Sequence, residues 1–229
     1  MKNFRKKSVF LFFIFFSVFV QVFFSGCSDS SPEIARCSAT VVFSYNNDES
    51  SLPDVKFQAY ISALSDVRRL ESFSVENRGN KFKWIVENPY IFSDSNNSWA
   101  CALNLCNNKN QKIPLGIYDV VYNDAQGQSV SSVLNVFYPE ELYKKTFPEA
   151  ENFIKDNTLK QIAVYTESGM LLYYGVFKEA WKSDEIIFKN FKDSQKYRIC
   201  YSAFDESYLV MSKYFYKNSE SQNSSEIKS

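Results

Sequence analysis

The feature that most constrains the fold is an alternation of apolar and polar side chains, which begins near Thr40 and recurs along the chain. Its clearest case is residues 55–63, where apolar positions alternate with Lys56, Gln58, Tyr60 and Ser62. The apolar positions are Val55, Phe57, Ala59, Ile61 and Ala63. An apolar period of two is typical of a β-strand with one buried face. We therefore predict an all-β, antiparallel fold.

The same alternation predicts further strands on either side of this one. They are centred on Val41, Phe43 and Tyr45, on Phe82, Trp84 and Val86, on Trp99, Cys101, Leu103 and Leu105, and on residues 130–138. Polar, turn-forming stretches separate them at 46–51, 76–80, 93–98, 107–111 and 124–127. About seven short strands within roughly 100 residues suit a two-sheet sandwich. We place this sandwich at residues 38–138.

The sequence Pro114-Leu115-Gly116-Ile117-Tyr118-Asp119-Val120 resembles the tyrosine corner of immunoglobulin-like domains. In that motif a tyrosine hydroxyl near the start of the penultimate strand bonds to backbone upstream. Val120 stands where antibody domains have cysteine, and Trp84 is placed to be the core tryptophan of a middle strand. The resemblance implies an immunoglobulin-like sandwich over residues 38–138. It is architectural and transfers no function.

The pattern changes after Pro139. Residues 139–157 suit short helical turns, with Thr146 as a cap and Pro148 in a first turn, so we predict a helical connector. Strands resume at 159–166, 170–177, 186–188, 197–204 and 208–216. These predict a smaller antiparallel β unit over 158–216 that docks on the sandwich, because five short strands alone bury little surface. Residues 217–229 are a polar tail and are predicted to be disordered.

Residues 1–26 have the layout of an export signal. Basic residues precede an apolar run at 9–24, and the small residues Ser25 and Gly26 precede Cys27. Phe24-Ser25-Gly26-Cys27 resembles the relaxed, spirochaete-like lipobox of bacterial lipoproteins, in which leucine usually holds the first position. The resemblance implies cleavage before Cys27, lipidation of its sulfur, and residues 27–37 as a tether. A cleaved secretion signal and an uncleaved membrane anchor are the alternatives.

Composition excludes several functions. The leader is basic and has no acidic residue, whereas the whole chain has 26 basic and 26 acidic residues, so the mature part is mildly acidic. Nucleic-acid binding, which needs a basic face, is therefore not expected. The chain has no histidine, which removes histidine-activated nucleophiles and histidine-bound zinc. We predict no cofactor, no metal and no catalytic residue. Carboxylate chemistry stays as the enzymatic alternative, although neighbouring acids on a strand point to opposite faces.

Four cysteines remain after Cys27 in an exported setting that permits disulfides. They are Cys37, Cys101, Cys106 and Cys200. Their number allows three pairings, and buried free thiols are the alternative. No second close pair accompanies Cys101 and Cys106, so a metal tetrahedron is not expected.

Aromatic residues provide the candidate contacts with a partner. Tyr173 and Tyr174 could present ring faces to a glycan or a protein, and Trp181 lies in a predicted loop between two lysines. Core packing is the alternative for all three. The sequence thus predicts a lipid-anchored protein of the cell envelope, held to the membrane by its N-terminal lipid, that binds an envelope protein or glycan without catalysis. An envelope enzyme that acts on glycan or peptide through carboxylates is the competing hypothesis.

Overall fold

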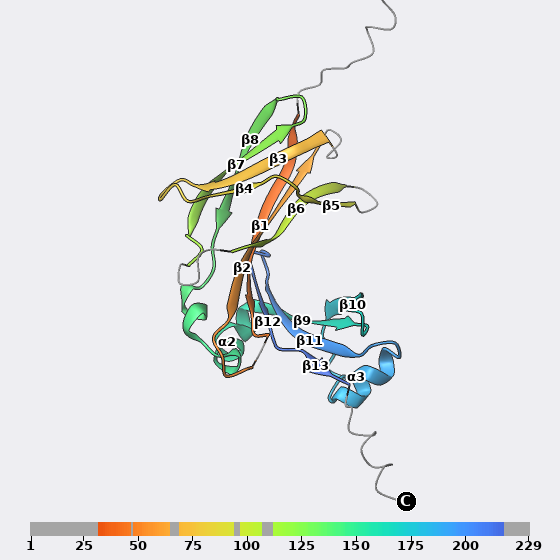
Figure 1. Cartoon of the computed structure of the whole chain (residues 1–229). Helices are drawn as coiled ribbons and strands as arrows, with labels where there is room; N and C mark the ends of the chain where they lie inside the picture. Colours follow the sequence, from red (N-terminus) through yellow and green to blue (C-terminus); the bar gives the residue numbers. More distant parts are fainter. Residues whose placement is uncertain (1–31, 47, 65–68, 94–96, 107–111, 218–229) are drawn as a thin grey trace, which may run out of the picture.

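The computed structural model describes residues 32–46, 48–64, 69–93, 97–106 and 112–217, and two β-sheets dominate this part of the chain (Figure 1). The larger sheet has nine strands in the order β10-β9-β11-β12-β1-β2-β6-β5, with β13 paired to β11. The smaller sheet has the order β4-β3-β7-β8. The strands are β1 (Ile34–Ser44), β2 (Asp54–Ala63), β3 (Leu70–Asn77), β4 (Lys83–Val86), β5 (Tyr90–Ser93), β6 (Ser98–Leu105), β7 (Gly116–Asp124), β8 (Ser129–Val136), β9 (Thr158–Tyr165), β10 (Leu171–Val176), β11 (Lys196–Ala203), β12 (Tyr208–Met211) and β13 (Phe215–Tyr216).

The predicted sandwich is confirmed. Strands β1, β2, β6 and β5 face the smaller sheet, and apolar side chains from both sheets form one core. When the strands β1 to β8 are lettered A, B, C, C′, D, E, F and G in chain order, the two layers read A-B-E-D and C′-C-F-G. These are the layers of an immunoglobulin-like sandwich. The alternation does not predict two of the eight strands, β3 and β5.

The tyrosine corner is present at the start of β7. The hydroxyl of Tyr118 donates a hydrogen bond to the carbonyl oxygen of Pro114 at 2.7 Å, and the Tyr118 side chain is fully buried. Trp84 is also in the core, where its ring stacks on Phe57 at a centroid distance of 4.9 Å. It lies on β4, at the edge of the smaller sheet, and not on the middle strand as predicted.

The second β unit is not a separate body docked on the sandwich, because it extends the larger sheet. β12 pairs in parallel with β1, with Val41 opposite Tyr208 and Ser44 opposite Met211. Figure 1 shows β1 and β2 running from the sandwich down to the part of the larger sheet that contains β9, β11 and β12. The predicted helical connector forms η2 (Glu140–Lys144), α2 (Phe147–Ile154) and η3 (Lys155–Asn157), and it packs into the same core.

One predicted strand is wrong. Residues 186–188 belong to α3 (Asp184–Asn190), which covers the outer strands of the larger sheet together with the loop before it. A run of three apolar residues fits a helix or a strand equally well, and the acidic residues Asp184 and Glu185 favour the start of a helix. Strands β9, β10 and β11 confirm three other predicted strands of this unit, and β12 and β13 divide the last one.

The boundaries at both ends differ from the prediction or lie beyond the described residues. The predicted tether 27–37 is shortened by the sheet, since β1 begins at Ile34 and the backbone N–H of Leu64 donates to the carbonyl oxygen of Glu33 at 2.9 Å. The leader 1–26, Cys27 and residues 218–229 lie outside the described residues.

Candidate functional site

A groove lies on the face of the larger sheet that is turned away from the smaller sheet. The sheet curls so that residues from β2, β5 and β6 and residues from β9, β10 and β12 line the same hollow, which has a volume of about 620 Å³. We call it the outer groove. Its volume is within the range of sites that hold small ligands or short segments of a partner. Its aromatic lining residues are Tyr60, Tyr90, Phe92, Trp99 and Tyr174.

Strand register gathers four of these rings on one wall. Tyr60 of β2 lies opposite Cys101 of β6, and Cys101 lies opposite Tyr90 of β5. Two residues further along the same two strands, and therefore on the same face, Trp99 of β6 lies opposite Phe92 of β5. Directly opposed residues share a face of the sheet and are in contact distance. Tyr90 is 62% exposed and Phe92 is 48% exposed, so this wall offers ring faces to a ligand.

The other wall comes from the far end of the sheet and is more polar. Tyr174 of β10 is half-exposed, and its hydroxyl donates to the side-chain oxygen of Gln161 at 2.7 Å. Across the groove the Tyr60 hydroxyl donates to the side-chain oxygen of Gln58 at 2.6 Å. Burial raises the pKa of Tyr60 to about 12, so this hydroxyl stays protonated and keeps its bond to Gln58 at any physiological pH.

Charged side chains lie at the ends of the outer groove. Arg36 lines it near the start of β1, and Asp205 and Glu206 line it in the turn between β11 and β12. The hydroxyl and then the backbone N–H of Ser207 donate to Asp205 and lower the pKa of its carboxyl. A carboxyl that serves as a general acid needs a raised pKa, and the shift of Asp205 is in the opposite direction.

Trp181 had been predicted as an exposed contact, and this prediction is wrong. Its side chain is only 6% exposed. The loop between β10 and α3 folds back over the sheet, where the Trp181 ring packs edge-on against Tyr173, Phe177 and Phe191 at centroid distances of 5.7 to 5.9 Å. The ring is covered by other aromatic side chains of the chain itself, so it is not the exposed contact that the sequence predicted.

The pair Tyr173 and Tyr174 is divided by the pleat of β10. Tyr173 lies opposite Val164 and packs with Trp181 in a second core, which covers the face of the sheet opposite the outer groove. Tyr174 points the other way and lines the outer groove. Of the three predicted contacts, only Tyr174 belongs to the candidate site.

Sequence reasoning missed the other four rings. Tyr60 occupies a polar position of the alternation in β2, and a large aromatic side chain on the solvent face was the available signal. In β6 the period of two is correct, but its phase is the reverse of the prediction. The small side chains of Ala100 and Ala102 face the core, whereas Trp99, Cys101 and Leu103 line the outer groove.

The predicted disulfides are corrected, because Cys37, Cys101, Cys106 and Cys200 are all free. Cys101 and Cys106 are five residues apart in extended chain, roughly 16 Å, whereas a disulfide needs Cα atoms within about 7 Å. Cys37 lies opposite Ile61 and points toward the smaller sheet, away from Cys101 on the outer face. Cys200 is fully buried in β11.

The thiols are therefore expected to differ sharply in reactivity. Cys106 is exposed and should react quickly with a maleimide in the native protein, whereas burial raises the pKa of Cys200 to about 12 and should block its reaction until the chain unfolds. Mass spectrometry of timed samples checks this, and Cys106→Ser should remove the fast phase. Recovery of a peptide with Cys101 bonded to Cys106 would contradict the structure.

No protein-family model matches the sequence, and a search of the curated proteins also finds no match. Within the described ranges, the helices are too short and too polar to cross a bilayer. The same residues contain no group of three or more acidic or cysteine side chains arranged to hold a metal ion.

Proposed function

We propose that the protein is a lipid-anchored binding module of the cell envelope, which holds a partner in the outer groove and does not catalyse a reaction. The observation that carries this proposal is the row of rings from β2, β5 and β6 on an exposed face of the sheet. Isolated exposed apolar residues are common, but rings gathered in a groove with amide and charged groups beside them are typical of binding sites.

The competing hypothesis is an envelope enzyme that uses two carboxylates. Among the described residues that line the outer groove, Asp205 and Glu206 are the acidic ones, and they are neighbours in one turn. A glycosidase places its two carboxyls on opposite sides of the scissile bond and raises the pKa of one of them. The lowered pKa of Asp205 and the position of both acids on one side favour binding.

Photo-crosslinking in intact cells tests the site. A photoreactive amino acid at Tyr174 or Phe92 should give a discrete adduct with a partner, and Trp99→Ala should reduce its yield about tenfold, since loss of a central aromatic contact costs 1 to 2 kcal/mol or more. The matched control places the same group at Phe153, which is 44% exposed and lies on α2, a helix that contributes no residue to the lining of the outer groove. Equal adducts at Phe153 and Tyr174 would reject the outer groove as the binding site.

The anchor is tested separately by metabolic labelling with a fatty-acid analogue. Support for it comes from the resemblance of residues 24–27 to a lipobox, and two or more acyl chains suffice for stable attachment to a membrane. The full chain should take the label and Cys27→Ser should not. Label that persists in the Cys27→Ser chain would exclude this residue as the site of lipidation.

A further inference from the structure

Strand β5 forms one end of the larger sheet. Its partner is β6, so one edge of β5 has no strand beside it among the described residues. All four residues of β5 are exposed, and none is charged or proline. Exposed sheet edges are normally shielded by charged side chains, prolines or a covering segment, since their free N–H and C=O groups pair readily with another strand.

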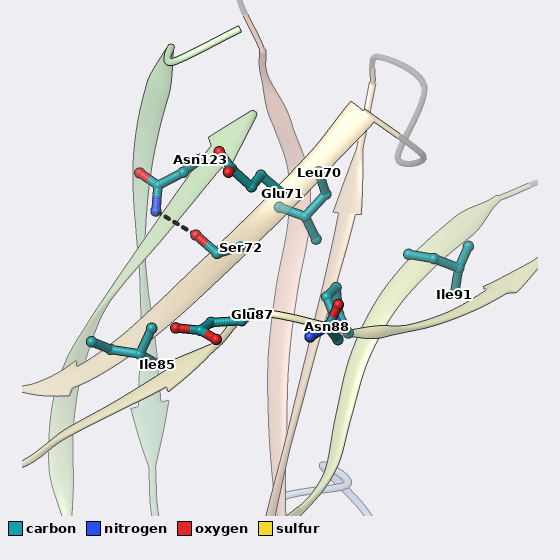
Figure 2. Close-up of a pocket in the computed structure, with 9 residues that line it drawn as sticks. Leu70, Glu71, Ser72, Ile85, Glu87, Asn88, Ile91 and Asn123 are labelled. Carbon is teal, nitrogen blue, oxygen red and sulfur yellow. Dashed lines mark hydrogen bonds between the residues drawn. The ribbon is translucent and has the colours of Figure 1, made fainter. Parts of the chain in front are cut away.

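Each face of β5 borders a hollow. Tyr90 and Phe92 line the outer groove on one face. Ile91 points to the other face and lines a second hollow, of about 820 Å³, whose other walls are the start of β3, the outer face of β4 and the link between β4 and β5 (Figure 2). We call it the edge hollow. A strand added beside β5 would direct its side chains alternately toward the two hollows.

The two hollows differ in chemistry. The outer groove offers rings beside β5. The edge hollow has the exposed carboxylates of Glu71 and Glu87, and none of the described residues that line it is basic. Its other polar groups are neutral, such as Asn123, whose side-chain amide donates to the hydroxyl of Ser72 at 3.2 Å (Figure 2). Apolar side chains therefore complement one side of β5 and basic side chains the other.

We propose that an extended segment of a partner protein, with alternating apolar and basic side chains, adds as a strand to the free edge of β5. The main-chain hydrogen bonds would provide affinity, and the two hollows would select alternate side chains. This inference rests on the proposed function of the outer groove and identifies its partner as a peptide. A second copy of the chain does not fit, because its β5 would bring Ile91 or aromatic side chains, and no basic residue, to the carboxylates.

The test uses the full chain in a neutral detergent and a fluorescent octapeptide that alternates lysine and valine. Anisotropy should show saturable binding, and N-methylation of the peptide backbone should weaken it at least tenfold because the methyl groups block strand pairing. Glu87→Lys should weaken binding about fivefold, the effect of a surface ion pair near its upper limit. The matched control is Glu141→Lys, a charge reversal at an exposed residue of η2 that should leave binding unchanged.

Several outcomes would overturn the inference. The N-methylated peptide could bind as well as the parent, a glutamate–valine peptide could bind equally, or Glu141→Lys could reduce binding as much as Glu87→Lys. Binding of a chitin tetrasaccharide that the peptide does not compete with would assign the outer groove to a glycan. That last result would leave the proposed function intact, whereas loss of the specific adducts at Tyr174 and Phe92 would remove both proposals.

Discussion

A chain that ends after Tyr138 is expected to lose its folded core, although it keeps all eight strands of the sandwich, from Ile34 of β1 to Val136 of β8. Buried side chains from the rest of the chain complete that core. They are Leu142, Phe147, Ala150, Ile154, Tyr201, Ala203, Tyr208 and Val210. Full burial of one large apolar side chain stabilises a fold by about 1.5–3 kcal/mol, whereas the net stability of a domain is about 5–15 kcal/mol. Loss of all eight should leave no stable native state.

The truncation also uncovers β1. Residues 41–44 would lose their parallel partner in β12, and the new edge would present backbone groups beside fully buried Val41 and Phe43. Circular dichroism and urea titration of the truncated chain should show no cooperative transition. The control is a chain that ends at Lys217, which keeps every described contact. Cooperative unfolding of residues 1–138 at the midpoint of the full chain would show that the sandwich folds alone.

This expected dependence shows what the sequence could not reveal. Alternation within 55–63 predicted β2 because the buried face of a strand imposes a local period of two. The pairing of β1 with β12 joins residues more than 160 positions apart, such as Val41 and Tyr208, and no local pattern records it. The predicted boundary at residue 138 therefore marks a change of local pattern and not the end of a sheet.

The candidate site illustrates a second limit. In β6 both phases of the alternation contain residues that can be buried, because Ala100 and Ala102 alternate with Trp99 and Cys101. The closely packed interface with the smaller sheet accepts the alanines, and the bulky side chains turn outward. Sequence reasoning assigned the larger side chains to the core, which is the usual outcome for strands. Only the three-dimensional register shows that these rings join Tyr60 and Tyr174.

Local chemistry with a fixed geometry was predicted correctly. The tyrosine corner was recognised from seven consecutive residues, since a hydroxyl four residues after its acceptor needs no distant partner. The environment of Trp181 was not predicted correctly, because its burial depends on how the loop between β10 and α3 packs on the rest of the chain. Lysines on either side indicated an exposed loop, yet Lys178 lies over the ring with its ammonium 5.4 Å from the centroid. Lysine side chains can cover an aromatic ring while their charged ends stay in water.

Replacing Trp181 with alanine is accordingly expected to destabilise the protein and not to remove a binding contact. Truncation of a buried tryptophan costs about 3–5 kcal/mol, because the transfer free energy is lost and a cavity is left. Three rings, those of Tyr173, Phe177 and Phe191, would lose their shared neighbour, and the cover over β9 and β10 would loosen.

The matched control is Trp99→Ala on the outer face, where the side chain is only partly buried and contributes less to stability. Chemical denaturation should therefore show a large fall in the unfolding midpoint for Trp181→Ala and a small fall for Trp99→Ala. Crosslinking at Tyr174, measured where both variants are folded, should be reduced strongly by Trp99→Ala and little by Trp181→Ala. If the Trp181→Ala chain kept the unfolding midpoint of the parent but lost the crosslink, Trp181 would be a binding residue and not a core residue. The two tryptophans thus separate folding from binding within one sheet, because its two faces carry a sealed core and an open groove.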